Sequence, residues 1–91
     1  MEIVTKDSSF TMLTEELPGK PTDPNDYIDK WYTFEIEFNY VSTTMRARFA
    51  PTGGVFNDWS NTLTMLHTDA VGPVYFAVLN GTILIDNISI D

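Results

Sequence analysis

Residues 31–50 decide the fold, and they read WYTFEIEFNYVSTTMRARFA. Across residues 32–40 apolar side chains alternate with polar ones. Because successive side chains of a strand point to opposite faces, this alternation predicts a strand with one buried face and one polar face. The alternation returns in residues 45–49, where Arg46 and Arg48 separate apolar positions. We therefore predict an antiparallel hairpin.

The turn of this hairpin decides which residues face each other across the ladder. We expect Ser42 and Thr43 to form a two-residue loop. The expected pairs are then Tyr40 with Met45, Phe38 with Ala47 and Glu37 with Arg48. The loop has no Asn-Gly pair of the kind that tight hairpin turns favour, so the sequence leaves the register open.

A second hairpin is signalled by Asn80-Gly81, which separates the apolar residues 74–79 from residues 82–85. A type I′ turn needs two positive φ angles, and Asn-Gly supplies them. The first of these segments is a continuous apolar run. This run predicts a central strand that is covered on both faces, or one whose second face is covered by a partner.

The rest of the chain reads as short strands and loops of one domain, residues 1–91. Short strands are expected at residues 10–13 and 63–66. Residues 15–30 carry three prolines and a glycine, which predicts an extended Pro-rich surface loop. Residues 51–54 read as a turn that leads into a loop with aromatic side chains. No segment has the length and caps of a three-turn helix.

Composition excludes several classes of function. The chain has 91 residues and no cysteine, so it has neither a disulfide framework nor a thiolate metal site. With 13 acidic and 5 basic residues its net charge is -8, which repels the phosphates of nucleic acids. No apolar run approaches the ~20 residues that cross a bilayer, and residues 1–4 do not resemble a signal peptide. We expect a soluble, acidic protein, associated with a virion or a cell surface.

A family resemblance is carried by four groups of residues. They are Trp31-Tyr32, residues 45–54 followed by Trp59, residues 74–79, and residues 80–90 with Asp86-Asn87. In this order they resemble the C-terminal half of concanavalin A-like, laminin G-like jelly rolls and related carbohydrate-binding modules. The resemblance implies a jelly-roll-like antiparallel β-sandwich. A full jelly roll of this family is longer than this chain, so either the sandwich is reduced or neighbouring chains complete it.

The alternating acids Glu35 and Glu37 superficially resemble the catalytic strand of glucanases that share this fold. Paired carboxylates on one strand face could serve glycoside hydrolysis. The third position of the pattern is Asn39, and an amide cannot donate and retake a proton. We expect instead that both glutamates pair across the strands with Arg46 and Arg48, and that the chain is not an enzyme and has no catalytic residues.

The candidate ligand site is the loop that follows Gly53-Gly54. It holds Phe56, Asn57, Asp58 and Trp59. Flat aromatic faces bind sugar rings and protein partners alike, and the polar residues between them could bond hydroxyl groups. The alternative is that both aromatic rings plug the end of the sandwich. Trp31, at the mouth of the first strand, is expected in the core.

Asp86 is the one candidate metal ligand. It resembles the closing-strand aspartate that binds a structural calcium ion in some carbohydrate-binding modules, so structural calcium is the only cofactor considered. The acidic residues 23–29 do not form an EF-hand loop, because Ile28 and Phe34 stand where that loop needs its glycine and its last glutamate.

The sequence thus predicts an all-β fold, a single small antiparallel β-sandwich that is reduced or completed by oligomerisation. The expected core consists of Tyr32, Phe34, Ile36, Phe38, Phe49, Phe76, Val78, Ile85 and Ile88. The function expected first is that of a structural subunit in a larger assembly, such as a decoration or fibre protein of a phage particle. The alternative is a lectin-like carbohydrate-binding module. The expected partners are proteins or further copies of the chain, or a glycan, but no nucleic acid and no membrane.

Overall fold

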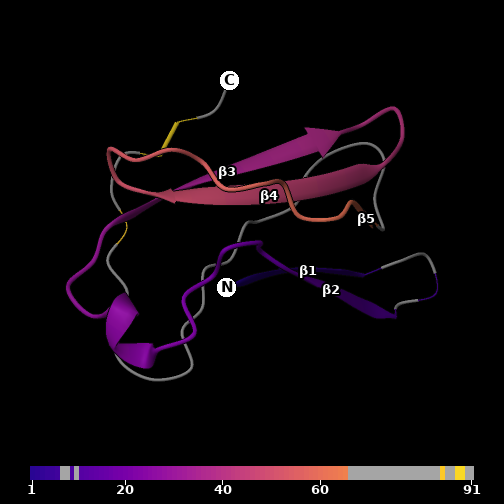
Figure 1. Cartoon of the computed structure of the whole chain (residues 1–91). Coiled ribbons are helices and arrows are strands. Elements are labelled where there is room, and N and C mark those ends of the chain that lie inside the picture. The colour runs from indigo at the N-terminus through magenta and orange to yellow at the C-terminus, as the bar shows by residue number, and fades with distance from the viewer. Residues whose placement is uncertain (7–8, 10, 66–84, 86–87, 90–91) are drawn as a thin grey trace.

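The computed structural model describes residues 1–6, 9, 11–65, 85 and 88–89. In these residues the fold is all-β, as predicted, with two antiparallel sheets and one short 3-10 helix (Figure 1). The elements are β1 (Glu2–Lys6), β2 (Met12–Glu16), η1 (Pro24–Tyr27), β3 (Tyr32–Asn39), β4 (Thr44–Pro51) and β5 (Leu63–Thr64). The hairpin expected around Asn80-Gly81 lies outside the described residues.

The hairpin of β3 and β4 forms as predicted, but its register differs by two residues from the expected one. The pairs include Phe38 with Met45, Glu37 with Arg46 and Glu35 with Arg48. A shift of two residues keeps every side chain on its predicted face, because the side-chain period of a strand is two.

The side chain of Asn39 is the physical reason for this register. Its Oδ1 accepts hydrogen bonds from the backbone N–H groups of Val41 and Ser42, both at 3.0 Å. This Asx turn closes residues 40–43 into a loop that is longer than the expected two residues. Thr43 turns the chain back with a φ of 56°.

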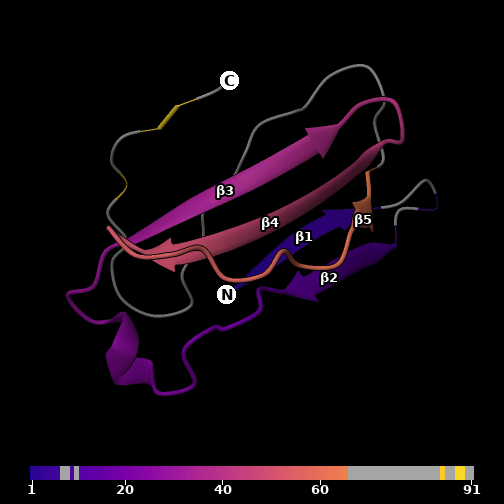
Figure 2. The ribbon, with the colours of Figure 1, turned by 45° about the horizontal axis from the view of Figure 1, so that its top comes forward.

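The second sheet lies against the first and closes a small core between them (Figures 1 and 2). β1 contributes Ile3, and the residue after β2 contributes Leu17. They pack against Ala47 and Phe49 of β4 and Leu63 of β5. The described chain is therefore a small β-sandwich, with β4 at its centre.

Only part of the expected core is buried. Phe49 is buried, with the rings of Tyr32 and Phe34 against it at 5.7 and 6.0 Å between centroids. Phe34 itself is 48% exposed, which contradicts its place in the core. β3 has β4 as its only strand neighbour among the described residues, so Phe34 is covered from one side. Ile85 and Ile88 were also expected in the core, and both are exposed.

Residues 57–64 run along the other edge of β4, yet only Leu63–Thr64 form a strand there. Upstream of β5, the N–H groups of Asn57 and Ser60 donate to the carbonyl oxygens of Phe49 and Ala47, at 2.9 and 2.8 Å. The buried Ser60 accepts the N–H of Ala47 on its Oγ at 3.0 Å. This side-chain bond replaces a regular ladder bond, which explains the late start of β5.

The N-terminal sheet was only partly foreseen. No strand was expected at β1, because its alternation of apolar and polar residues is too short to predict one. β2 begins at Met12 and continues to Glu16, beyond the strand expected at residues 10–13. β2 therefore includes residues 15 and 16, which were expected to begin the surface loop 15–30. β1 is a strand because it pairs with β2, and the local sequence pattern alone does not indicate this pairing.

The remainder of the loop is also more ordered than predicted, because it contains η1. Asp23 caps this turn by accepting the N–H of Asn25 at 3.0 Å, and Pro24 occupies its first position. The hydroxyls of Tyr27 and Tyr32 donate to the carbonyl oxygens of Pro21 and Asp26, at 2.9 and 2.7 Å. These bonds tie the loop to the start of β3.

We predict that Phe49→Ala lowers the free energy of unfolding by roughly 3–5 kcal/mol, because it opens a cavity at a fully buried site. Phe34→Ala should cost less than half as much, since that ring is already half in water. Urea denaturation of both variants at low protein concentration measures the difference. An equal or reversed order would contradict the assignment of Phe49 to the centre of the core.

Candidate functional site

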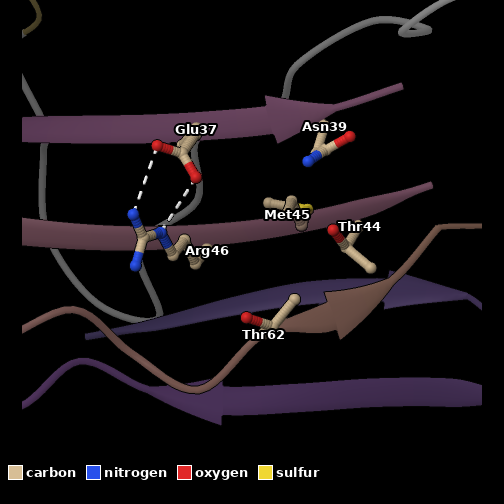
Figure 3. Close-up of a pocket in the computed structure, with 6 residues that line it drawn as sticks. All are labelled: Glu37, Asn39, Thr44, Met45, Arg46 and Thr62. Carbon is tan, nitrogen blue, oxygen red and sulfur yellow. Dashed lines mark hydrogen bonds and ion pairs between the residues drawn. The ribbon is translucent and has the colours of Figure 1, made fainter. Parts of the chain in front are cut away.

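Two ion pairs lie on the outer face of the β3–β4 hairpin. Arg46 donates from Nε to Glu37 Oε1 at 2.9 Å and from Nη2 to Glu37 Oε2 at 3.3 Å (Figure 3). Arg48 donates from Nη2 to Glu35 Oε1 at 2.9 Å. Each pair joins directly opposed residues of the ladder. Both carboxylates are therefore cross-strand partners of the two arginines, as the sequence predicted, although Glu37 faces Arg46 and not Arg48 as expected.

The same two arginines cover the aromatic rings of the predicted loop. The guanidinium carbons of Arg46 and Arg48 lie 4.2 and 4.3 Å from the ring centroid of Trp59. That of Arg48 also lies 4.5 Å from the ring of Phe56. Cation–π contacts of this kind contribute about 0.5–1 kcal/mol each at exposed sites. The two rings are half-buried on the outer face, neither free as a platform nor part of the buried core.

The four residues expected to form one ligand site have different neighbours. Phe56 and Trp59 stack with the arginines, whereas Asn57 lines a groove with Tyr32 and Phe49. Asp58 is exposed. Asp86, the expected calcium ligand, lies outside the described residues.

The groove that contains Asn57 has a volume of about 470 Å³. Trp31, expected in the core, is 55% exposed at this groove. Position 31 shares its parity with Glu35 and Glu37, so the alternation of β3 keeps Trp31 off the core face. The same alternation, counted in the sequence, would have predicted the exposure of Trp31. The full lining is Gly19, Pro21, Asp26, Lys30, Trp31, Tyr32, Phe49, Pro51 and Asn57.

The walls of this groove are held by contacts within the chain. The Tyr32 hydroxyl donates to the carbonyl oxygen of Asp26 on one side. On the other side Gly19, with a φ of 81°, lies against the side chain of Asn57. A Cβ at Gly19 would stand 2.6 Å from Asn57 Nδ2, so no larger residue fits there without displacing the amide. The exposed Trp31 thus lines one groove together with Asp26, Lys30 and Asn57.

A second hollow of about 170 Å³ lies between Glu37, Asn39, Thr44, Met45, Arg46 and Thr62 (Figure 3). Its two charged side chains bond to each other, and Asn39 Oδ1 holds the hairpin turn. Its two charged side chains and the Oδ1 of Asn39 are therefore occupied by bonds within the fold.

Within the described ranges, no group of three or more His, Cys, Asp or Glu side chains is placed to hold a metal ion. In the same residues, no helix is long and apolar enough to span a membrane. Comparison with protein-family models, with curated proteins and with solved structures found no match. A proposal of function must therefore come from the surfaces of the molecule.

We predict that Arg46 and Trp59 stabilise the fold jointly. In a double-mutant cycle of Arg46→Met and Trp59→Leu, the coupling free energy should be about 0.5–1 kcal/mol, since either single change removes the same cation–π contact. Urea denaturation of the four proteins measures it. The pair Arg46→Met and Val55→Leu serves as control, because Val55 is exposed and has no ring. A coupling energy of zero for the first pair would show that the stack contributes nothing to stability.

Proposed function

We propose that the chain is a non-catalytic structural subunit of a larger protein assembly, of the kind that forms decorations or fibres on a phage particle. The observation that carries the proposal is the outer edge of β3. In the order β3-β4-β5, β3 is the end strand of its sheet among the described residues. It is eight residues long, and an unpaired edge of that length is a template for a further strand.

Exposed apolar side chains support the same proposal. Phe34 lies on the core side of β3 and is still half exposed. At the two ends of the hairpin, Val41 and Val55 are 97% and 88% exposed. The buried apolar residues of the described chain are few and include two alanines. Burial against neighbouring subunits would add the apolar contact that this small core lacks.

The expected result is a solution mass above the 10.3 kDa of one chain. The mass should rise with protein concentration, and it should rise further between 50 and 500 mM NaCl, because salt screens the repulsion between copies of charge -8. Light scattering between about 5 and 500 µM tests this, with circular dichroism to confirm the fold. A fully folded monomer under all these conditions would contradict the proposal.

A second candidate function, glycan binding, is favoured by the groove at Trp31. The apolar face of a sugar ring stacks on an exposed indole, while Asp26, Lys30 and Asn57 offer acceptors and donors for ring hydroxyls. This groove replaces the Phe56–Trp59 loop as the place where a lectin-like site would lie, because the rings of that loop are covered by arginines.

If the groove binds glycans, Trp31→Ala should reduce the affinity for a bound sugar at least tenfold while leaving the thermal unfolding temperature nearly unchanged. Trp59→Phe is the matched control and should keep the affinity. A glycan array followed by calorimetry with the best sugar measures both. Binding that depends on Trp59 and not on Trp31 would return the site to the loop, and no binding to any sugar would remove this candidate.

A further inference from the structure

The peptide bond between Asp23 and Pro24, at the start of η1, joins an acid to a proline. It is the only Asp-Pro bond in the sequence. Its nitrogen belongs to the proline ring, so the peptide is a tertiary amide without an N–H. The carboxyl group of an aspartate can reach its own carbonyl carbon through a five-membered ring, and a carboxyl group is a competent nucleophile. A nucleophile and a leaving group are therefore present in adjacent residues.

The fold holds the Asp23 carboxyl against this bond. Asp23 Oδ1 accepts the N–H of Asn25 at 3.0 Å. The ring that this hydrogen bond closes contains the carbonyl carbon of Asp23 and the nitrogen of Pro24. The side chain is therefore folded back over the peptide bond and does not extend away from it. Holding a nucleophile beside its target raises the rate of an intramolecular reaction, because little conformational freedom is left to lose.

A second hydrogen bond polarises the carbonyl group of the same peptide. The N–H of Asp26 donates to the carbonyl oxygen of Asp23 at 2.9 Å. When a nucleophile attacks a carbonyl carbon, negative charge develops on the oxygen, and an N–H that already points at it stabilises that charge. The turn thus brings together the nucleophile, a donor for the developing charge and the proline leaving group.

The turn is also accessible to water and to protons. Asp23, Pro24 and Asn25 are exposed, and η1 contains no buried residue. Among the described residues no cation forms an ion pair with Asp23, so no ion pair has to break before its carboxyl is protonated. The charged and titratable residues of this loop, and of the β3 residue bonded to it, are Lys20, Asp23, Asp26, Tyr27, Asp29, Lys30 and Tyr32.

We propose that the chain cleaves itself between Asp23 and Pro24 in mild acid. The protonated carboxyl of Asp23 adds through one oxygen to its own carbonyl carbon, and the bond from that carbon to the Pro24 nitrogen breaks. The carboxyl proton passes to this nitrogen, which leaves as a secondary amine. One water molecule then hydrolyses the cyclic anhydride on Asp23 to two carboxyl groups. The products are residues 1–23 and 24–91, and the reaction occurs once per chain.

Cleavage at this bond leaves the two pieces attached and alters the groove at Trp31. Ile3 and Leu17 of the first piece belong to the core cluster that the second piece completes. Pro21 and Asp26 lie on either side of the cut, and both line the groove. The new chain ends therefore form in the segment that makes one wall of the groove. This inference is independent of the assembly role and of glycan binding.

Mass spectrometry of the whole chain tests the reaction. The protein is kept at about pH 5 and 37 °C for several days, and circular dichroism shows that it stays folded. We expect two new masses, for residues 1–23 and 24–91, whose sum is the mass of the intact chain plus one water. Asp23→Asn keeps a capping oxygen but has no carboxyl group, so its cleavage should be at least roughly tenfold slower. Asp29→Asn changes another exposed aspartate of the same loop and should cleave like the wild type.

Comparison with the unfolded chain shows whether the turn contributes, since an Asp-Pro bond has an intrinsic lability in acid. Urea above the unfolding transition removes both hydrogen bonds of Asp23. Cleavage should be roughly tenfold faster in the folded chain at the same pH. Equal or faster cleavage in urea would contradict the role of the turn, and a folded wild type that stays intact would overturn the proposal. If the chain unfolds at pH 5, the comparison is made at the lowest pH at which it is folded.

Discussion

The ladder between β3 and β4 is the constraint on which the other described features depend. Its register is set by one side chain, Asn39, whose Oδ1 accepts hydrogen bonds from two backbone N–H groups of the turn. That register places Glu35 opposite Arg48 and Glu37 opposite Arg46. It also determines which residues of β3 turn their backbone groups away from β4. A different turn would move the ion pairs, the aromatic stack and the edge together.

The outer face shows how ion pairs and aromatic rings organise a small sheet that has little core. Each arginine bonds a glutamate of β3 and also covers the ring of Trp59, which belongs to the segment along β4. The arginines thus connect the two edges of β4 across its polar face. Exposed ion pairs contribute little by themselves, and here their main effect is to orient the guanidinium groups over the rings. This explains why the aromatic loop is not a free binding platform.

The two proposed roles, assembly and ligand binding, draw on different parts of the molecule. The β3 edge offers backbone groups and the half-exposed Phe34, whereas the groove at Trp31 offers a flat ring among polar side chains. Both begin where the loop of residues 17–31 enters β3. The hydroxyl bonds of Tyr27 and Tyr32 hold the loop at the groove, and among the described residues no strand pairs with the other edge of β3. The two roles are therefore compatible in one subunit.

By itself the sequence determined the all-β class, the β3–β4 hairpin and the face of each strand residue, which puts the two glutamates and the two arginines on one polar face. These follow from local alternation, which depends on the period of a strand and not on distant contacts. Only the tertiary structure decided the register with the ion pairs that follow from it, the strand β1 and the exposure of Phe34. The register depends on how Asn39 bonds to its turn, and β1 depends on its ladder with β2. The exposure of Phe34 follows because β3 is an end strand of its sheet among the described residues, and local alternation does not record the order of strands in a sheet.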